Sequence, residues 1–285
     1  MSIVPMKELL KDAYEKGYAV PAINVSNMET VMAVLEKAYE MKSPIILQIA
    51  PIQIQNQNIS YDEIVKIIKI FSKRFSIRCA IHQDHSMSVD ECIKAVNGGV
   101  TSVMFDGSKL SYEDNKKGTI KVVEYCKEKG ITVEAELGKV GGAEGEESVD
   151  ADNQIYTDPE LAKDFASKTK IDALAVAIGN AHGFYSENPK IDFERLERLR
   201  KNINIPMVLH GGSGIPDEDI QKAIKKGIAK INFFTEIDFE FTKKFALEVT
   251  NNKNIYMMSA IEKARQSMMK KIEEKIRVCM SGGRI

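Results

Sequence analysis

Short apolar runs alternate with longer amphipathic stretches along almost the whole chain. The apolar runs predict eight strands, at Tyr18–Asn24, Pro44–Ile49, Arg78–His82, Ser102–Phe105, Thr132–Leu137, Ala173–Ile178, Met207–His210 and Ala229–Phe233. The amphipathic stretches predict helices between them, at about Met28–Met41, Tyr61–Phe75, Val89–Asn97, Tyr112–Lys129, Pro159–Lys168, Phe193–Lys201, Asp217–Lys225 and Glu236–Thr250. A last helix is expected at about Ser259–Val278.

Signals at the helix ends support this division. Ser88 and Asp90 are expected to be N-terminal caps, and glycines stand where helices should stop, at Gly98-Gly99, Gly130 and Gly227. Eight strand–helix units in 285 residues predict an α/β protein with a single (β/α)8 TIM barrel. The barrel is expected to span residues 1–285 as one domain, with an extra C-terminal helix.

Polar and glycine-rich residues are concentrated where the predicted strands end. These are Asp84-His85, Asp106 to Ser108, Glu134 and Glu136, Asn180 and His182, His210 to Gly214, and Asn232 to Thr235. In a barrel of this kind the active site forms at the carboxyl ends of the strands. A packed barrel does not need these residue types at those points, so the pattern predicts an enzyme.

All four histidines lie at predicted strand ends: His82 is the last residue of the third strand, and the other three lie in these segments. Three neutral imidazoles with one open position are typical of a catalytic zinc site, so His85, His182 and His210 are the candidate ligands. A lone histidine is more often a packed core or surface residue, but three at strand ends favour a metal. Side chains alternate along a strand, so His82 and Asp84 share one face and His85 would point to the opposite face. His85 can turn inward only if the strand has broken near Asp84.

The loop after the seventh strand has the composition of a phosphate site. Gly211-Gly-Ser-Gly214 leads into a helix that begins near Asp217, and so offers backbone N–H groups, a hydroxyl and a helix N-terminus. Barrel enzymes often hold phosphate here and on the loop after strand eight, which reads Asn232-Phe-Phe-Thr235. On its own GGSG is more often a tight turn, but its place in the barrel favours phosphate.

A glycine-dense loop follows the fifth strand. Four glycines occur between Gly138 and Gly145, and glycine density permits movement. A lid that carries a carboxylate could bring a proton-transfer group to a bound substrate. The acidic residues that follow are interpreted as a solvated loop: Glu146, Glu147, Asp150 and Asp152.

Net charge, apolar stretches and cysteine spacing indicate which partners and which cellular location to expect. The formal net charge is −1 and no basic stripe with interleaved aromatics occurs, so we expect no nucleic-acid partner. No stretch is long enough to span a bilayer, so we expect no membrane association. The four cysteines have no CxxC spacing; two disulfides are one alternative, but reduced, packed thiols are favoured in a chain without a secretion signal. A cytoplasmic location is expected.

Longer motifs carry a family resemblance over nearly the whole chain. They are Ala22-Ile-Asn24, His82-Gln-Asp84-His85, Ser102-Val-Met-Phe-Asp-Gly-Ser108, Val133-Glu-Ala-Glu-Leu-Gly138, Tyr156-Thr-Asp-Pro159, Asp172-Ala-Leu-Ala-Val-Ala-Ile-Gly-Asn-Ala-His-Gly183, Val208-Leu-His-Gly-Gly-Ser-Gly-Ile215 and Lys230-Ile-Asn232. The sequence resembles the class II, zinc-dependent ketose-bisphosphate aldolases, which act on fructose 1,6-bisphosphate or tagatose 1,6-bisphosphate. The resemblance implies reversible cleavage of a phosphorylated ketose into dihydroxyacetone phosphate and an aldehyde.

The resemblance also implies roles for individual residues. Zn2+ would be held by His85, His182 and His210 and would polarise the ketose carbonyl. Asp84 would handle the proton of the C4 hydroxyl, and Glu144 would exchange a proton at the donor carbon. The remaining implied positions are Glu136, near an alternative metal position, and the substrate- and phosphate-binding residues Asn24, Gly183, Gly211, Ser213, Asn232 and Thr235. Backbone carbonyls near Gly183 and Gly211 would bind a monovalent cation, Na+ or K+, and the assembly would be a homodimer or homotetramer.

Three departures from the family pattern leave the substrate open. Relatives usually carry a Ser- or Thr-led segment with glycine where this chain reads Ala50-Pro51-Ile52-Gln53, and Gly145 replaces an aspartate. An Asp-Pro-Arg run, whose arginine reaches the distal phosphate in relatives, aligns with Asn252-Lys253-Asn254. Asparagine cannot replace that charge, although Lys253 could compensate.

Three interpretations of function therefore stay open. The leading one is a zinc aldolase acting on a ketose 1-phosphate, most simply fructose 1,6-bisphosphate. A second keeps the chemistry but acts on tagatose 1,6-bisphosphate, a deoxy sugar acid phosphate or a sulfonated ketose phosphate. A third is a noncatalytic sugar-phosphate-binding subunit, which would be free to lose Asp84 or a metal histidine; none is lost here.

Overall fold

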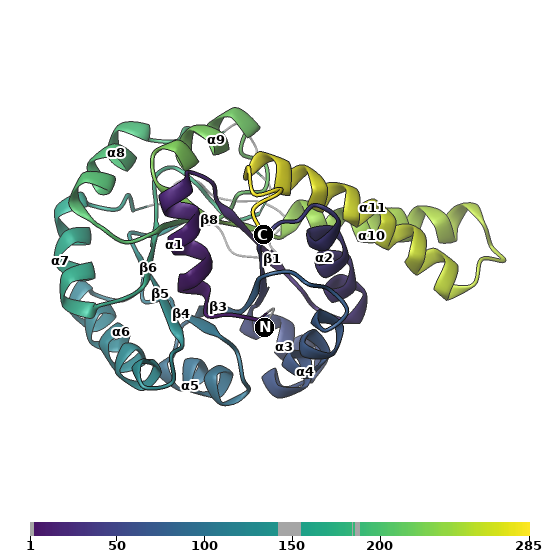
Figure 1. The fold of residues 1–285 in the computed structure, drawn as a ribbon, viewed down its shortest axis with the longest axis horizontal. Helices are drawn as coiled ribbons and strands as arrows, with labels where there is room; N and C mark the ends of the chain where they lie inside the picture. Colours follow the sequence, from purple (N-terminus) through teal and green to yellow (C-terminus); the bar gives the residue numbers. More distant parts are fainter. Residues whose placement is uncertain (1–2, 142–154, 184, 186–188) are drawn as a thin grey trace.

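The computed structural model describes residues 3–141, 155–183, 185 and 189–285. Its eight strands are all parallel and pair in sequence order to close a barrel, so the predicted (β/α)8 fold is confirmed. The strands are β1 (Val20–Asn24), β2 (Ile45–Ile49), β3 (Cys79–Ser86), β4 (Ser102–Phe105), β5 (Thr132–Leu137), β6 (Ala173–Val176), β7 (Met207–Leu209) and β8 (Ile228–Phe233). Figure 1 shows the helices arranged around them.

All nine predicted helices are present, with ends shifted by a few residues at most. They are α2 (Met28–Glu40), α4 (Tyr61–Ser72), α5 (Val89–Asn97), α6 (Tyr112–Lys127), α7 (Pro159–Thr169), α8 (Phe193–Asn202), α9 (Asp217–Lys225), α10 (Thr235–Asn251) and α11 (Met257–Val278). Ser88 caps α5, because its side chain accepts from the Glu91 N–H. Asp90 lies inside the first turn of α5, so its prediction as a cap is wrong.

Two helices were not predicted. α1 (Met6–Lys16) buries Met6, Leu9, Leu10 and Ala13 on one face. α3 (Pro51–Gln57) is a short helix that begins at a proline, whose fixed φ suits a first helical turn. Both helices lie outside the regular alternation of strands and helices.

Helix α1 closes the amino-terminal end of the barrel. The Val4 N–H donates to the carbonyl of Cys79 at the start of β3, and the Lys7 N–H donates to the Thr132 hydroxyl at the start of β5. In Figure 1, α1 crosses in front of the strands. Its apolar face packs on small interior side chains, among them Ala22, Ala80, Ala173, Ala175 and Ala229. Because this end is filled with apolar groups, the polar interior positions are left for the opposite end.

Helices α10 and α11 form an antiparallel arm that projects well beyond the barrel in Figure 1. The near end of α11 returns to the barrel and packs against α2, where Arg265 pairs with Glu36 and Lys37 with Glu273. The far end carries solvent-exposed apolar side chains, including Met257 (66% exposed) and Met258 (67% exposed). Within the described ranges, no helix combines the length and the apolar character needed to cross a bilayer.

All four cysteines are free and buried. The prediction of reduced, packed thiols is therefore confirmed. Burial raises the pKa of each thiol, for example that of Cys79 to about 12.

Candidate active site

An irregularity in β3 brings Asp84 and His85 to the same site. Three residue steps on β3, from Gln83 to Ser86, pair with only two on β4, from Val103 to Phe105. The extra residue makes a bulge, and His85 adopts the left-handed conformation there with φ of 45°. This is the break near Asp84 that the sequence required for His85 to turn inward.

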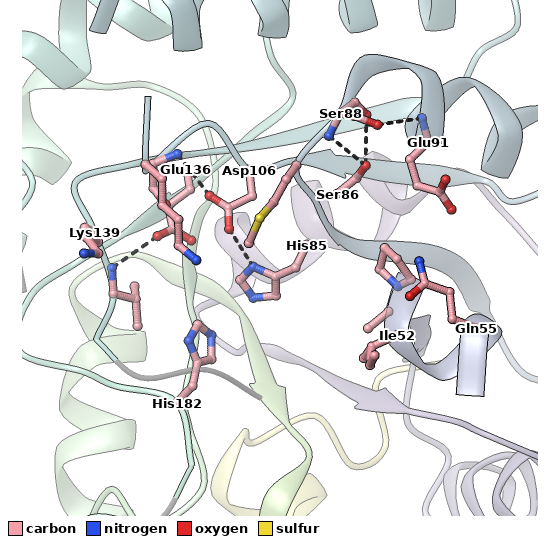
Figure 2. Close-up of a pocket in the computed structure, with 16 residues that line it drawn as sticks. Ile52, Gln55, His85, Ser86, Ser88, Glu91, Asp106, Glu136, Lys139 and His182 are labelled. Atoms are coloured by element: carbon pink, nitrogen blue, oxygen red, sulfur yellow. Dashed lines mark hydrogen bonds and ion pairs between the residues drawn. The ribbon is translucent and has the colours of Figure 1, made fainter. Parts of the chain in front are cut away.

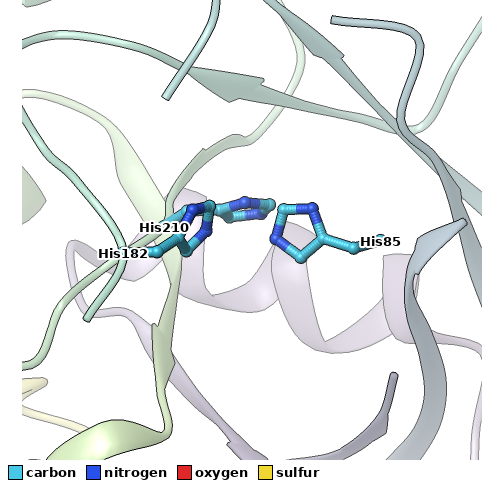
Figure 3. A group of neighbouring side chains, drawn as sticks. All are labelled: His85, His182 and His210. Carbon is cyan, nitrogen blue, oxygen red and sulfur yellow. The ribbon is translucent and has the colours of Figure 1, made fainter. Parts of the chain in front are cut away.

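His182 and His210 reach the same point from loops that follow β6 and β7. Figure 3 shows the three imidazole rings beside one another. The ring centroid of His85 lies 4.8 Å from that of His182 and 4.5 Å from that of His210, and the last two are 5.6 Å apart. One nitrogen of each ring lies within 4.8 Å of the other two. The strand ends thus bring together three residues that are far apart in sequence.

The electronic state of the rings suits a metal ion. Burial lowers the pKa of His182 and of His210 well below the ordinary value, and the neighbouring His85 lowers both further. Among the described residues, His182 Nε2 and His210 Nδ1 have no hydrogen-bond partner. A buried, unsatisfied nitrogen is costly, and a divalent ion bound to its lone pair would remove that cost. Imidazole nitrogens gathered around one point fit Zn2+.

A second group of potential ligands shares His85. His85, Asp106 and Glu136 also offer atoms within 4.8 Å of one another. Asp106 Oδ2 lies 3.1 Å from His85 Nδ1 (Figure 2). Burial acts to raise the pKa of Asp106, but the hydrogen bond and charge of His85 together with the hydrogen bonds of Ser108 outweigh it, and the pKa is lowered. Burial, followed by the charge of Asp106, raises the pKa of Glu136 to about 8. These residues fit an alternative metal position beside the first.

Asp84 is fully buried, and its charge acts on both His182 and His210. Its Oδ1 accepts a hydrogen bond of 3.2 Å from Asn232 Nδ2. In the described part of the chain, its Oδ2 has no hydrogen-bond partner. A carboxylate that is fixed through one oxygen can exchange a proton with a bound hydroxyl through the other.

A small cavity lies between the loops that follow β6, β7 and β8. It is lined by His182, Gly183, Gly211, Ser213, Asn232, Phe234 and Thr235. The Ser213 hydroxyl and Asn232 Oδ1 are buried and have no hydrogen-bond partner within the described residues. Tyr185 ties two of the loops together, because its hydroxyl accepts from the Ala181 N–H and donates to the Gly211 carbonyl. Five of the six residues predicted to bind substrate therefore surround one cavity.

Asn24, the sixth, has a different environment. Its Oδ1 accepts from Gln48 Nε2 at 2.6 Å, and its Nδ2 donates to Gln53 Oε1 at 3.3 Å. Gln53 also accepts from the Ala50 N–H and donates to the Ser26 hydroxyl. Asn24 thus connects the end of β1 to the first turn of α3.

A larger cavity of about 470 Å³ opens beside the histidines. Figure 2 shows His85, His182, Asp106 and Glu136 along one part of it, with Ile52 and Gln55 of α3 across from them. Its wall is completed by apolar and cationic side chains, including Pro51, Met87, Val140, Lys109 and Lys139. The cavity therefore gives a ligand of several carbons access to the metal-binding residues.

A family model described as fructose-bisphosphate aldolase class-II matches residues 4–284 of the chain. The chain belongs to the class II fructose-bisphosphate aldolase family. It is a metal-dependent aldolase, a carbon–carbon lyase. This membership agrees with the resemblance seen in the sequence motifs.

Solved structures resemble this aldolase over its full length. The YdjI aldolase from Escherichia coli K12 is 33% identical with a TM-score of 0.86, and the match covers 99% of each chain. A candidate fructose-1,6-bisphosphate aldolase from Coccidioides immitis is 29% identical with a TM-score of 0.88, covering 97% of this chain and 96% of the other. The fructose-bisphosphate aldolase of Campylobacter jejuni, at 22% identity, shares the fold with a TM-score of 0.84, covering 100% and 97%.

Some residues of the aldolase site escaped the sequence reasoning. Asp106, Glu134 and Lys230 received no role; Asp106 follows β4, whereas Glu134 and Lys230 lie within β5 and β8. The alternation of side chains along a strand could have identified two of them, because Glu134 shares a strand face with Glu136, and Lys230 shares one with Asn232. The lid residue Glu144 lies within 142–154, outside the described residues.

Proposed function

We propose that this aldolase uses Zn2+ to cleave a ketose 1-phosphate reversibly, most simply fructose 1,6-bisphosphate, giving dihydroxyacetone phosphate and an aldehyde such as glyceraldehyde 3-phosphate. The observation that carries the proposal is the convergence of three imidazoles, His182 and His210 buried and His85 partly buried, beside Asp84. Zinc would be held by His85, His182 and His210, with Glu136 near an alternative position. When bound, the ion would supply a Lewis acid for the ketose carbonyl.

The side chains around the ligands have separate tasks in this proposal. Asp84 takes the proton from the C4 hydroxyl during cleavage and returns it during condensation. Its bond to Asn232 keeps one oxygen fixed while the other meets the substrate. Ser213 and the backbone around Gly211 bind the phosphate of the dihydroxyacetone portion, with Gly183, Asn232 and Thr235 around it.

Three further assignments belong to the same proposal. Glu144 exchanges a proton at the donor carbon. Asn24 orients the substrate from the end of β1, although both sides of its amide are already bonded to glutamines. A monovalent cation, Na+ or K+, binds backbone carbonyls near Gly183 and Gly211.

The distal group of the ketose motivates a second candidate substrate class. Asn252 to Asn254 lie in the turn at the far end of the arm in Figure 1, and none of them lines the described cavity of the same chain. At the cavity, the Ala50–Gln53 segment forms the start of α3, and Lys109 and Lys139 are the cations in its lining. Lysines at this end favour an anionic distal group without requiring a phosphate. Tagatose 1,6-bisphosphate, a deoxy sugar acid phosphate and a sulfonated ketose phosphate are the alternatives.

A coupled assay tests the chemistry. Purified protein is incubated with fructose 1,6-bisphosphate, and triose phosphate is detected with and without a chelator. We expect a chelator to abolish cleavage and added Zn2+ to restore it. Asp84→Ala should lower kcat by ~10²-fold or more while zinc content stays normal, because a general acid–base residue contributes about that much. Asp90→Ala, at an exposed position of α5, is the matched control.

Three outcomes would contradict parts of the proposal. Cleavage that continues at full rate in chelator removes the role of the metal. Loss of zinc from Asp84→Ala makes Asp84 a structural residue instead. Protein without metal and without turnover supports the noncatalytic subunit, against which the retention of Asp84 and all three histidines argues. A kcat/KM panel over the ketoses named above separates the substrates, and a strong preference for fructose 1,6-bisphosphate would end the alternatives.

We further propose a cytoplasmic homodimer or homotetramer with no nucleic-acid or membrane partner. Four reduced cysteines favour a reducing compartment. The exposed apolar side chains at the far end of the arm favour self-association through that end.

A further inference from the structure

A charged pair lies fully buried inside the barrel, directly behind one of the metal ligands. Glu134 of β5 and Lys230 of β8 each have no exposed side-chain surface, and Lys230 Nζ donates to Glu134 Oε2 at 2.8 Å. The other carboxylate oxygen, Oε1, lies 3.0 Å from His210 Nε2. Glu134 therefore uses one oxygen for the lysine and one for the histidine. An ion pair taken completely out of water is expensive, so its presence calls for a reason other than stability.

The geometry determines which nitrogen of His210 carries the proton. A carboxylate oxygen only accepts hydrogen bonds, so a neutral ring bound to Glu134 through Nε2 must carry its hydrogen there. The lone pair is then on Nδ1, which has no hydrogen-bond partner among the described residues and lies 3.4 Å from Oε2 of Glu136, a member of the second group of potential metal ligands. His85 is oriented in the opposite sense, because its Nδ1 meets Asp106.

We infer that Glu134 and Lys230 are positioning residues for the metal site: Glu134 fixes the tautomer and orientation of His210, and Lys230 holds Glu134 in place. This inference rests on the proposed zinc-dependent function. Carboxylates that receive the second N–H of a ligating histidine commonly control metal affinity. Here the lysine adds a constraint of its own, because it needs an acceptor at all times.

That constraint predicts an unusual response to Glu134→Gln. A glutamine has one acceptor oxygen in place of two, and Lys230 and His210 both require it. The buried ammonium takes the oxygen, which leaves the amide NH2 pointing at His210 Nε2. The ring proton then moves to Nδ1, where it blocks the metal. Adding Lys230→Met removes the competitor, so the glutamine oxygen returns to His210 and restores the original tautomer.

Zinc affinity measured by competition with a chromophoric chelator tests this cycle. We expect Glu134→Gln to weaken Zn2+ binding ~10- to 100-fold, in line with the loss of such partners at other sites. The double variant Glu134→Gln/Lys230→Met should recover most of that loss. Lys230→Met alone keeps the Glu134–His210 contact but removes the bond that holds Glu134, so it should weaken Zn2+ binding, though less than Glu134→Gln does. Glu273→Gln, which alters the Lys37–Glu273 pair between α2 and α11, is the matched control and should bind Zn2+ as wild type does.

Ring ¹⁵N spectra give a second readout that is independent of activity. The chain has only four histidines, so the His210 signals can be assigned by single replacements. In the metal-free protein the proton should sit on Nε2 in wild type and the double variant, and on Nδ1 in Glu134→Gln. Equal Zn2+ affinity in wild type and Glu134→Gln would overturn the inference, and so would a double variant no better than the single one. Wild-type protein that takes up no Zn2+ would overturn the proposed function itself.

Discussion

Gly211 is the position where a single methyl group should do most damage to the metal site. Its φ is +63°, and a Cβ built on it would lie 1.8 Å from the carbonyl oxygen of Ala181. Ordinary contacts begin at 3.4 Å, so the two loops would have to separate by about 1.6 Å. The obstacle is backbone, which cannot rotate away as a side chain can. Gly211→Ala must therefore displace Ala181, which precedes His182, or residue 211 itself, which follows His210, or both.

The size of the effect follows from two contributions. An alanine in the left-handed region costs about 1 kcal/mol, and forcing extra volume into a packed site costs roughly 1–3 kcal/mol. Gly130 provides a matched control, because its φ is +68° and a Cβ there meets nothing within 4 Å. Gly130→Ala should thus show the backbone cost alone. At about 2–4 °C per kcal/mol, we expect Tm to fall by ~3 °C for Gly130→Ala and by ~6–12 °C for Gly211→Ala.

Function should separate the two variants more clearly than stability does. A displacement of about 1 Å at a catalytic centre can cost ~10²-fold in rate. Gly211→Ala should therefore lose Zn2+ affinity and cleavage activity by at least that order, whereas Gly130→Ala should keep both. Thermal unfolding, chelator competition and the coupled assay measure the three quantities. If Gly211→Ala matched Gly130→Ala in Tm and in Zn2+ affinity, the close approach of the β6 and β7 loops could not be what positions the ligands.

Two further predictions concern the rest of the molecule. Burial raises the pKa of the cysteine thiols, that of Cys79 to about 12, so at pH 8 they stay protonated; a thiol reagent such as DTNB should label almost none of the four in the native protein and all four in guanidinium chloride. Rapid native labelling would contradict the packing. Met257→Glu/Met258→Glu should shift sedimentation toward the monomer if the far end of the arm mediates self-association, whereas the exposed Lys121→Glu on α6 should leave it unchanged. An unaltered assembly in the arm variant would remove the arm from the interface.

The missing elements in the sequence-based prediction share a physical origin. Helix α1 precedes the first strand, so the alternation of strands and helices does not predict it. Its apolar face is buried only because it packs on the end of the closed barrel. Helix α3 is seven residues long, too short for periodicity to be distinguished from a loop. The predicted end of β6 lay beyond its last strand residue, because the apolar run continues through Ala177 and Ile178 where the chain has already left the sheet; the predicted end of β7 lay one residue too far, at His210.

In the active site, too, the sequence indicated some features and left others to the tertiary structure. Spacing and residue type were enough to select Asp84 and the three histidines, because few other reasons exist for such residues at strand ends. They could not reveal how His85 turns inward, since the bulge depends on the register between β3 and β4. They also could not identify Glu134 and Lys230 as partners, because those residues are 96 positions apart and meet only across the closed barrel.

The amino-acid sequence by itself determined the number and order of the strands, the end of the barrel that carries chemistry, and the residue types available there. Those properties are local or periodic, so they can be read from neighbours along the chain. Only the tertiary structure decided which nitrogen of each imidazole faces the shared centre, which carboxylate orients which ring, and where the buried lysine finds its acceptor. These depend on contacts between strands, and strands far apart in the chain meet only when the barrel closes.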